Sequence, residues 1–258
     1  MKMIDSHIHL DHYHDEEIQL MLADSVNIDY LLSVSFDLES CKRNLQLAKT
    51  FQKIKPAFGY HPEQSLPTTE YLEKLLNWID EHQNEMVAIG EVGLPYYLRS
   101  EQKVSCEQYS QYTSLLETFI QLAKVLKKPI VLHAVYDDAP VVCDLLEKYS
   151  VKKAHFHWFK GDKKTITRMI AHGYYISITP DVLYDEEIQQ LVHIYPLAQM
   201  MVETDGPWPF KGPFLGKMTH PNMMMESICM IAKIKNLPKE KVFKIILQNT
   251  KGFYQIVE

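Results

Sequence analysis

The sequence lacks closely spaced cysteines, an excess of basic charge and any apolar run long enough to cross a bilayer. Its four cysteines lie far apart and form no CxxC pair; they are Cys41, Cys106, Cys143 and Cys229. We therefore expect reduced thiols in a reducing compartment rather than a disulfide framework. The formal net charge of −6 and the pI near 6.1 argue against a broad basic face for nucleic acid. An anionic substrate would need its charge balanced locally, by a metal or by a few cations.

The beginning of the chain does not resemble a signal peptide, because Asp5, Ser6 and His7 interrupt the first apolar run. No linker, low-complexity tract or internal repeat divides the sequence. We expect a cytoplasmic protein with no membrane association and a single domain over residues 1–258. Nothing in the sequence indicates an obligatory protein partner.

Short apolar runs alternate with longer amphipathic stretches along the chain. The runs that predict strands are 3–10, 30–36, 54–61, 86–94, 129–135, 154–159, 174–180 and 198–207. The stretches that predict helices are 15–23, 39–52, 69–83, 105–127, 138–149, 162–172, 185–193 and 222–235. Eight strand–helix units in a chain of 258 residues predict an α/β fold, a single (β/α)8 TIM barrel. An additional helix over 239–248 and the tail 249–256 are expected to pack on the outside.

The stretch IDSHIHL places two histidines one residue apart in the first predicted strand. Alternate side chains of a strand point the same way, so Asp5, His7 and His9 share one face. Two neighbouring imidazoles on one face can bind a divalent cation. Taken alone, the same pattern also fits core packing or a surface tract.

Further polar residues fall near the carboxyl ends of the other predicted strands. They are His61, Glu91, His133, His155, His157, Glu203 and Asp205. In a barrel of this type the strand ends converge on the face that carries the active site. Because scattered histidines have no reason to repeat at that position, the pattern indicates a metal centre. His155 lies two residues deeper than His157, which favours an interior position over a ligand role.

Several short motifs resemble those of the TatD family of metal-dependent hydrolases. They are DSHIHLD, GYHP, GEVGL, PIVLH, HWFKG and ETDGP, in the family's order from residue 5 to about residue 207, followed by NTKGFY. The family is a TIM-barrel branch of the amidohydrolase-like superfamily, and several members are deoxyribonucleases. The resemblance implies that the metal ligands are His7, His9, Glu91, His133, His157 and Asp205.

The ligand set implied by the resemblance suits one or two divalent cations. Mixed imidazole and carboxylate ligands favour Zn, Mn, Ni or Fe over Mg. Glu91 would bridge two ions, one held also by His7, His9 and Asp205 and the other by His133 and His157. Two ions about 3.5–4 Å apart stabilise the attacking and leaving oxygens of a displacement at phosphorus and make water more acidic. Glu91 and Asp205 are therefore the predicted catalytic residues.

Three other residues, His61, Asp5 and Glu203, are predicted to assist this centre, and Asp205 itself has a second predicted role. Asp205 would orient the water and take its proton as general base. His61 would donate a hydrogen bond to a substrate oxygen, the alternative being a structural role. Asp5 and Glu203 would accept the second N–H of ligating imidazoles, which usually donate to a carboxylate or a carbonyl.

The sequence departs from the family pattern where substrate would be recognised. Val135 stands at the position of an arginine that would hold phosphate, Pro95 replaces an acid, Lys160 a serine and His220 an asparagine. A lysine can hold phosphate as a point charge, so Lys160 either substitutes in part for the missing arginine or is a solvated loop cation.

The predicted function is hydrolysis of a small or single-stranded phosphodiester by metal-activated water. DNA is one candidate substrate, and 3′–5′ deoxyribonuclease activity is one form of the reaction. The alternative is amidohydrolase-like hydrolysis of a small ester, lactone or amide, which the loss of the arginine favours. A non-catalytic binding barrel would predict a damaged ligand position, and the sequence contains none.

Overall fold

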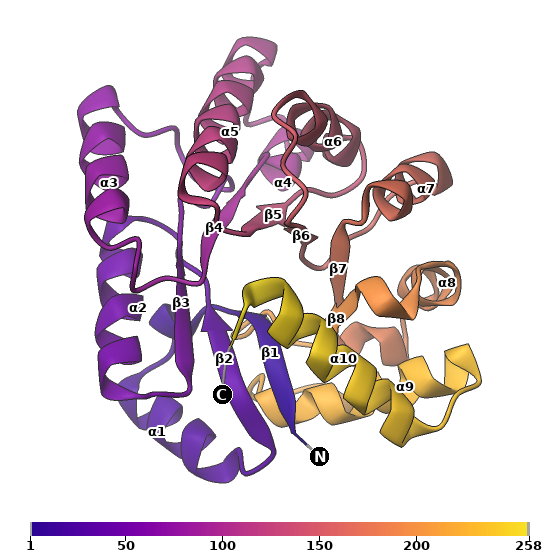
Figure 1. The fold of residues 1–258 in the computed structure, drawn as a ribbon. Coiled ribbons are helices and arrows are strands. Elements are labelled where there is room, and N and C mark those ends of the chain that lie inside the picture. Colours follow the sequence, from indigo (N-terminus) through magenta and orange to yellow (C-terminus); the bar gives the residue numbers. More distant parts are fainter. Residues whose placement is uncertain (1, 257–258) are drawn as a thin grey trace.

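Eight parallel strands form a nearly closed barrel in the computed structural model, which describes residues 2–256 (Figure 1). The strands are β1 (Met3–Ile8), β2 (Ile28–Ser33), β3 (Ile54–Phe58), β4 (Ala88–Gly93), β5 (Ile130–His133), β6 (Ala154–Phe156), β7 (Tyr175–Ile178) and β8 (Met200–Val202). They pair in sequence order, each in parallel with the next. Two backbone hydrogen bonds join the first strand to the segment after the last, from Asp205 N to His7 O (2.9 Å) and from His9 N to Gly206 O (2.8 Å). The predicted TIM barrel is confirmed.

Helices cover the outside of the barrel between the strands. They are α1 (Asp15–Asp24), α2 (Leu38–Thr50), α3 (Thr69–Glu81), α4 (Tyr96–Ser100), α5 (Cys106–Leu126), α6 (Asp138–Lys148), α7 (Lys163–His172), α8 (Glu186–Ile194), α9 (Met224–Lys235) and α10 (Lys239–Tyr254). Local signals set several ends: Asp162 caps the first turn of α7, and Gly173 ends it in a left-handed conformation with φ of 75°. None of the helices in residues 2–256 is both long and apolar enough to span a membrane.

The two faces of the strands build two separate apolar clusters. Outward-facing side chains such as Leu31, Ile130 and Ile176 pack against the helices in the larger cluster. The opposite face contributes Ile4, Leu32, Ala57, Ala88, Val131 and Met201 to a smaller cluster in the barrel interior. Phe253 and Tyr254, the last two residues of α10, belong to that interior cluster. The end of α10 therefore packs into the barrel interior.

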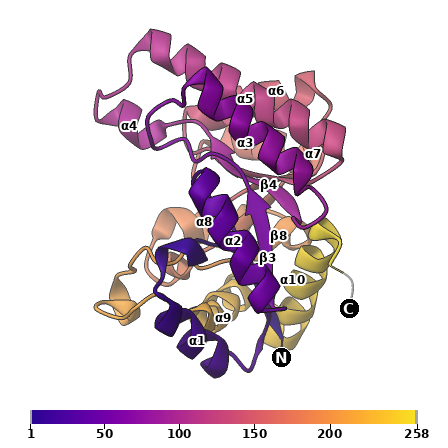
Figure 2. The same ribbon diagram turned by 90° about the vertical axis from the view of Figure 1, so that its left-hand side faces the viewer.

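The observed elements differ from the predicted ones in three places. The strands end earlier than predicted; β8 stops at Val202 because the next residues leave the ladder and Asp205 takes a left-handed conformation with φ of 48°. The short helix α4 was not predicted. The tail beyond residue 248 does not lie outside, because α10 continues to Tyr254 and inserts its end into the interior. Figure 2 shows α4 on one side of the barrel and α10 on the opposite side.

Candidate metal centre and active site

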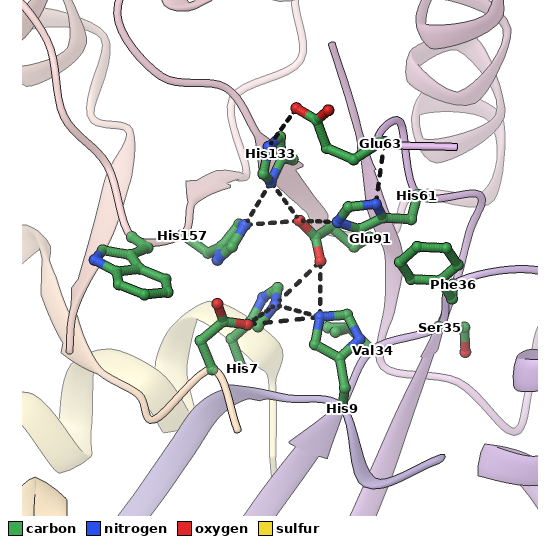
Figure 3. Close-up of polar contacts among 12 residues, drawn as sticks. His7, His9, Val34, Ser35, Phe36, His61, Glu63, Glu91, His133 and His157 are labelled. Atoms are coloured by element: carbon green, nitrogen blue, oxygen red, sulfur yellow. Dashed lines mark hydrogen bonds and ion pairs between the residues drawn. The ribbon is translucent and has the colours of Figure 1, made fainter. Parts of the chain in front are cut away.

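Five imidazoles surround the carboxylate of Glu91 at the carboxyl ends of the strands (Figure 3). The imidazoles belong to His7, His9, His61, His133 and His157, which come from β1 and from the ends of β3, β5 and β6. All five side chains and Glu91 are buried. The strand-end residues that the sequence singled out as ligands are thus brought to one point.

Close approach of two strands helps to position Glu91 against His133. A Cβ atom at Gly93 would lie 2.0 Å from the carbonyl oxygen of His133, so only glycine fits between β4 and β5 there. Leu94 N donates to the same carbonyl at 3.0 Å. The second glycine of GEVGL therefore permits the contact between the Glu91 and His133 strands.

Asp5 fixes the backbone near the site instead of orienting an imidazole as predicted. Its carboxylate accepts from His7 N (3.2 Å), Thr204 N (3.0 Å) and Thr204 Oγ1 (2.5 Å). Burial raises the pKa of Asp5 to about 7, although these hydrogen bonds favour the ionised form. The contacts tie β1 to the segment after β8, which carries Asp205.

One oxygen of Glu91 faces a first group of ligand atoms. Glu91 Oε2 lies 3.1 Å from His7 Nε2 and 3.2 Å from His9 Nε2. Asp205 Oδ1 lies 3.2 and 3.5 Å from the same two nitrogens. Two imidazoles and two carboxylates therefore converge, the donor set that the sequence assigned to the first cation.

The other oxygen of Glu91 faces a second group. Glu91 Oε1 lies 2.6 Å from His157 Nε2 and 3.0 Å from His133 Nδ1. His61 Nε2 also lies near this oxygen, at 3.4 Å. Glu91 thus stands between two groups of donor atoms, and each group could hold one cation.

The contacts inside the centre fit cations better than they fit a protein-only hydrogen-bond network. Ring nitrogens point at one another, His7 Nε2 to His9 Nε2 at 3.4 Å and His133 Nδ1 to His157 Nε2 at 3.2 Å. Asp205 Oδ1 and Glu91 Oε2 are buried without a hydrogen-bond partner among the described residues. Such atoms normally need a partner. Divalent cations would satisfy these atoms, and imidazole and carboxylate are suitable ligands.

The pKa values of the residues in the centre indicate that protons and cations compete for the same ligand atoms. Burial favours the neutral form of His7, but the carboxylates of Glu91 and Asp205 raise its pKa to about 9. Burial opposes ionisation of Glu91, yet the neighbouring imidazoles hold its pKa well below its usual range. A ligand nitrogen must lose its proton before it binds a cation, so cation affinity is expected to fall as the pH is lowered.

The protonation of His61 differs from that of the other rings. Burial lowers its pKa to about 4, so the ring is neutral near pH 7. Glu63 N donates to His61 Nδ1 at 3.1 Å, which leaves the hydrogen on Nε2. The ring of Phe36 stacks on His61 with centroids 4.4 Å apart and holds this orientation. His61 therefore presents an N–H donor to the centre, as the sequence prediction requires.

Two carboxylates contact the outer nitrogens of the second group. Glu203 Oε1 lies 3.8 Å from His157 Nδ1, which is beyond hydrogen-bond distance, and His157 Nδ1 is buried without a hydrogen-bond partner among the described residues. The carboxylate that was predicted to accept from a ligating imidazole therefore lies near this ring, without the hydrogen bond itself. Glu63 Oε1 lies 3.3 Å from His133 Nε2, and the same carboxylate accepts from Tyr97 N (2.7 Å) and Leu98 N (2.8 Å) at the start of α4. The sequence analysis missed Glu63. Its signal was a carboxylate two residues beyond the strand-end His61.

A pocket of about 480 Å³ opens above the centre. Aromatic side chains form much of its wall, namely Phe36, Tyr97, Trp158 and Trp208. Val135, at the position of the family's arginine, also lines the pocket, as do the carboxylates of Glu63 and Glu101. Within residues 2–256, no lysine or arginine contributes to its wall. The pocket is therefore aromatic and acidic apart from any bound cations.

Lys160 lies outside this pocket. Its Nζ binds Asp185 Oδ2 at 2.6 Å, and its side chain lines a separate hollow of about 680 Å³ beside α7 and α8. These contacts weigh against the phosphate-binding role, and the ion pair makes Lys160 a partner of Asp185 rather than the solvated loop cation of the alternative prediction. Of the other departures, Pro95 precedes α4, and His220 Nδ1 accepts from Asn222 N at 3.1 Å.

We expect Lys160→Ala to leave kcat/KM within about twofold of the wild type, because an ion pair near the surface contributes little at a distance. Steady-state kinetics on a phosphodiester across salt concentrations would test this, with the exposed Lys163→Ala as the matched control. A large fall in kcat/KM with a flatter salt dependence, confined to Lys160→Ala, would restore the phosphate-binding role.

Comparisons with known proteins identify relatives of this chain. A family model described as "TatD related DNase" matches residues 4–255. A protein of Haemophilus influenzae described as an uncharacterized metal-dependent hydrolase is 40% identical over 255 residues, covering 98% of this chain and 100% of that protein. The human protein named Deoxyribonuclease TATDN3 is 29% identical over 258 residues, covering 96% of this chain and 92% of the human protein.

Solved structures show the same fold. The crystal structure of YJJV, a TatD homolog from Escherichia coli, matches with a TM-score of 0.85 and 23% identity, covering 99% of this chain and 98% of that one. A hydrolase TatD family protein from Entamoeba histolytica matches with a TM-score of 0.82 and 18% identity, covering 98% of each chain.

Proposed function

Because the chain belongs to the TatD family of metal-dependent hydrolases, we propose that it hydrolyses a phosphodiester with the help of two divalent cations. The substrate we propose is small or single-stranded, and removal of nucleotides from the 3′ end of DNA is the first form to test. The name of the human relative, a deoxyribonuclease, supports this choice.

The observation that carries the proposal is the position of Glu91 between two groups of imidazoles. Its Oε2 faces His7 and His9, and its Oε1 faces His133 and His157. A carboxylate arranged in this way can bridge two cations. Paired cations are suited to phosphodiester cleavage, because one stabilises the attacking oxygen and the other the leaving oxygen.

The residues of the chain have separate roles in this reaction. When bound, the cations make a water more acidic and balance the charge that develops on the phosphate. Asp205, whose Oδ1 lies at the first group, accepts the proton of the attacking water. His61 donates from Nε2 to a substrate oxygen and so orients the phosphate.

The wall of the pocket supports a short, unpaired substrate. Tyr97 and Trp208 are 51% and 43% exposed at the mouth, where bases of a single strand could stack on them. A duplex would need a basic surface along its backbone, and the net charge of −6 gives no such excess. One phosphodiester carries a single negative charge, which the two cations can balance.

A specific observation favours a second candidate function, hydrolysis of a small ester, lactone or amide. Val135 leaves the pocket wall without the guanidinium that would hold a phosphate, and Glu63 and Glu101 add negative charge. An uncharged substrate would not be repelled by these carboxylates. The same water, activated in the same way, would attack its carbonyl carbon.

A hydrolase panel tests the proposal. Metal-free protein is supplied with Zn²⁺, Mn²⁺, Ni²⁺, Fe²⁺ or Mg²⁺ and assayed on labelled single-stranded and duplex DNA, a chromogenic phosphodiester, a phosphomonoester, a lactone and an amide. We expect metal-dependent phosphodiester cleavage, with single-stranded DNA shortened stepwise from its 3′ end. Turnover of lactone or amide without any phosphodiester cleavage would instead establish the second candidate.

A further inference from the structure

A chain of buried polar side chains runs through the barrel interior to the proposed metal centre. Tyr254 Oη lies 2.6 Å from His155 Nδ1, and His155 Nε2 lies 2.6 Å from Ser177 Oγ. Ser177 Oγ lies 2.5 Å from Glu203 Oε2. All four side chains are buried. They come from the end of α10, from β6, from β7 and from the segment after β8.

The hydrogen bonds of this chain have one direction. An ionised carboxylate only accepts, so Ser177 donates its single hydrogen to Glu203. The Ser177 oxygen must then accept from His155 Nε2–H. A neutral His155 with hydrogen on Nε2 has an acceptor at Nδ1, and Tyr254 donates to it. The donors therefore all have the same direction, from Tyr254 at the end of α10 through His155 and Ser177 to Glu203.

The chain holds Glu203 in one orientation. Ser177 donates to Oε2, while Trp158 N donates to Oε1 at 2.7 Å. With a donor on each oxygen, the carboxylate plane cannot turn freely. Oε1 is also the oxygen that lies 3.8 Å from His157 Nδ1. His157 Nδ1 is buried without a hydrogen-bond partner among the described residues, so the orientation of Glu203 sets how near a carboxylate oxygen lies to this outer nitrogen.

Stability alone explains this chain poorly. A buried hydrogen-bonded network adds little net stability compared with an apolar filling of the same shape. The surrounding interior is apolar, with Val131 and Met201 in the same cluster as Tyr254. Orientation of a neighbouring group is the more specific explanation, because ligating imidazoles are held through hydrogen bonds to their outer nitrogen.

We propose that Tyr254, His155 and Ser177 are positioning residues that act through Glu203 on His157. Through them the last helix, α10, supports the second of the two cation sites from the opposite end of the barrel. None of the hydrogen bonds in this chain involves a ring nitrogen of His7 or His9 or the carboxylate of Asp205, the groups at the first cation site. The proposal rests on the two-cation centre of the proposed function.

The test compares Tyr254→Phe and Ser177→Ala with a matched control, Tyr195→Phe. Tyr195 is also fully buried and donates to a backbone carbonyl, Tyr174 O at 2.8 Å, outside this chain of hydrogen bonds. Two readouts are needed besides activity. Titration with Mn²⁺, followed by paramagnetic resonance and calorimetry, gives the affinity of each of the two ions. Nitrogen-15 NMR of labelled histidines in the metal-free protein reports the tautomer of His155.

We expect Ser177→Ala to lower the affinity for one of the two Mn²⁺ ions, the ion at the His133–His157 site, by about 10–100-fold. This is the range observed when a hydrogen-bond partner of a metal ligand is lost. Tyr254→Phe, two hydrogen bonds further from Glu203, should weaken the affinity for this ion less and change the NMR signal of His155. The affinity for the other Mn²⁺ ion, at the His7–His9–Asp205 site, should be the same in all variants as in the wild type. Tyr195→Phe should bind both ions with wild-type affinity. A structural role for the chain would lower the melting temperature without this selective loss.

Second-ion affinity unchanged in Ser177→Ala and Tyr254→Phe would overturn the proposal while leaving the two-cation centre intact. Equal weakening of both ions would also overturn it, because the effect would then be general loosening of the fold. Wild-type protein that binds fewer than two ions would overturn the two-cation centre and this proposal together. If Tyr254→Phe does not fold, Ser177→Ala decides the outcome.

Discussion

Replacing Glu91 by glutamine should reduce hydrolytic activity by about a hundredfold or more, the scale on which lost electrostatic stabilisation of a transition state is felt. An amide carries no charge, and only one of its two outer atoms is an acceptor. It cannot present a negative oxygen both to the His7–His9 group and to the His133–His157 group. The measurement is kcat/KM at saturating metal, together with the number of Mn²⁺ ions bound.

Glu73→Gln is a suitable control for Glu91→Gln, because it makes the same chemical change at an exposed position of α3 that does not line the pocket. We expect it to retain its bound metal and most of its activity. Near wild-type turnover by Glu91→Gln, with two ions still bound, would mean that Glu91 does not bridge them.

The second large effect is expected for Asp205→Asn. Loss of a general base lowers a rate by about 10²–10⁴-fold, and an amide cannot take a proton from water. His7, His9 and Glu91 remain to hold the first ion, so its affinity should fall much less than kcat does. Separate measurement of kcat and of Mn²⁺ affinity distinguishes the two roles. Activity that returns fully when the metal concentration is raised would make Asp205 a ligand only.

The elements that the sequence predicted well are those with a strong local pattern. Apolar runs gave the place of every strand, because a parallel strand buried on both faces requires them. The ends of the strands were predicted too far along, since residues such as Asp205 stay buried after they leave the ladder. The helix α4 escaped prediction, because it is five residues long and its first N–H groups bind Glu63, a residue from a distant loop.

The tail of the chain shows a different limit. Its pattern predicts a helix but does not say what the end of that helix contacts. Tyr254 lies 99 positions from its partner His155, and no local signal links them. The same limit applies to Lys160. Its position in the sequence, after the sixth strand, is compatible with a phosphate contact, and only the tertiary structure shows that its Nζ binds Asp185 instead.

The sequence by itself determined the fold class and the chemical character of the site. Polar residues placed at the ends of parallel strands must meet at one rim, because closure of the barrel leaves them no other place. The tertiary structure decided how the side chains are divided: which imidazoles face which oxygen of Glu91, that Glu63 stands behind His133, and that Tyr254 reaches His155. These contacts join segments far apart in the chain. Their geometry depends on strand register and side-chain rotation, which packing of the whole barrel sets and which no short stretch of sequence encodes.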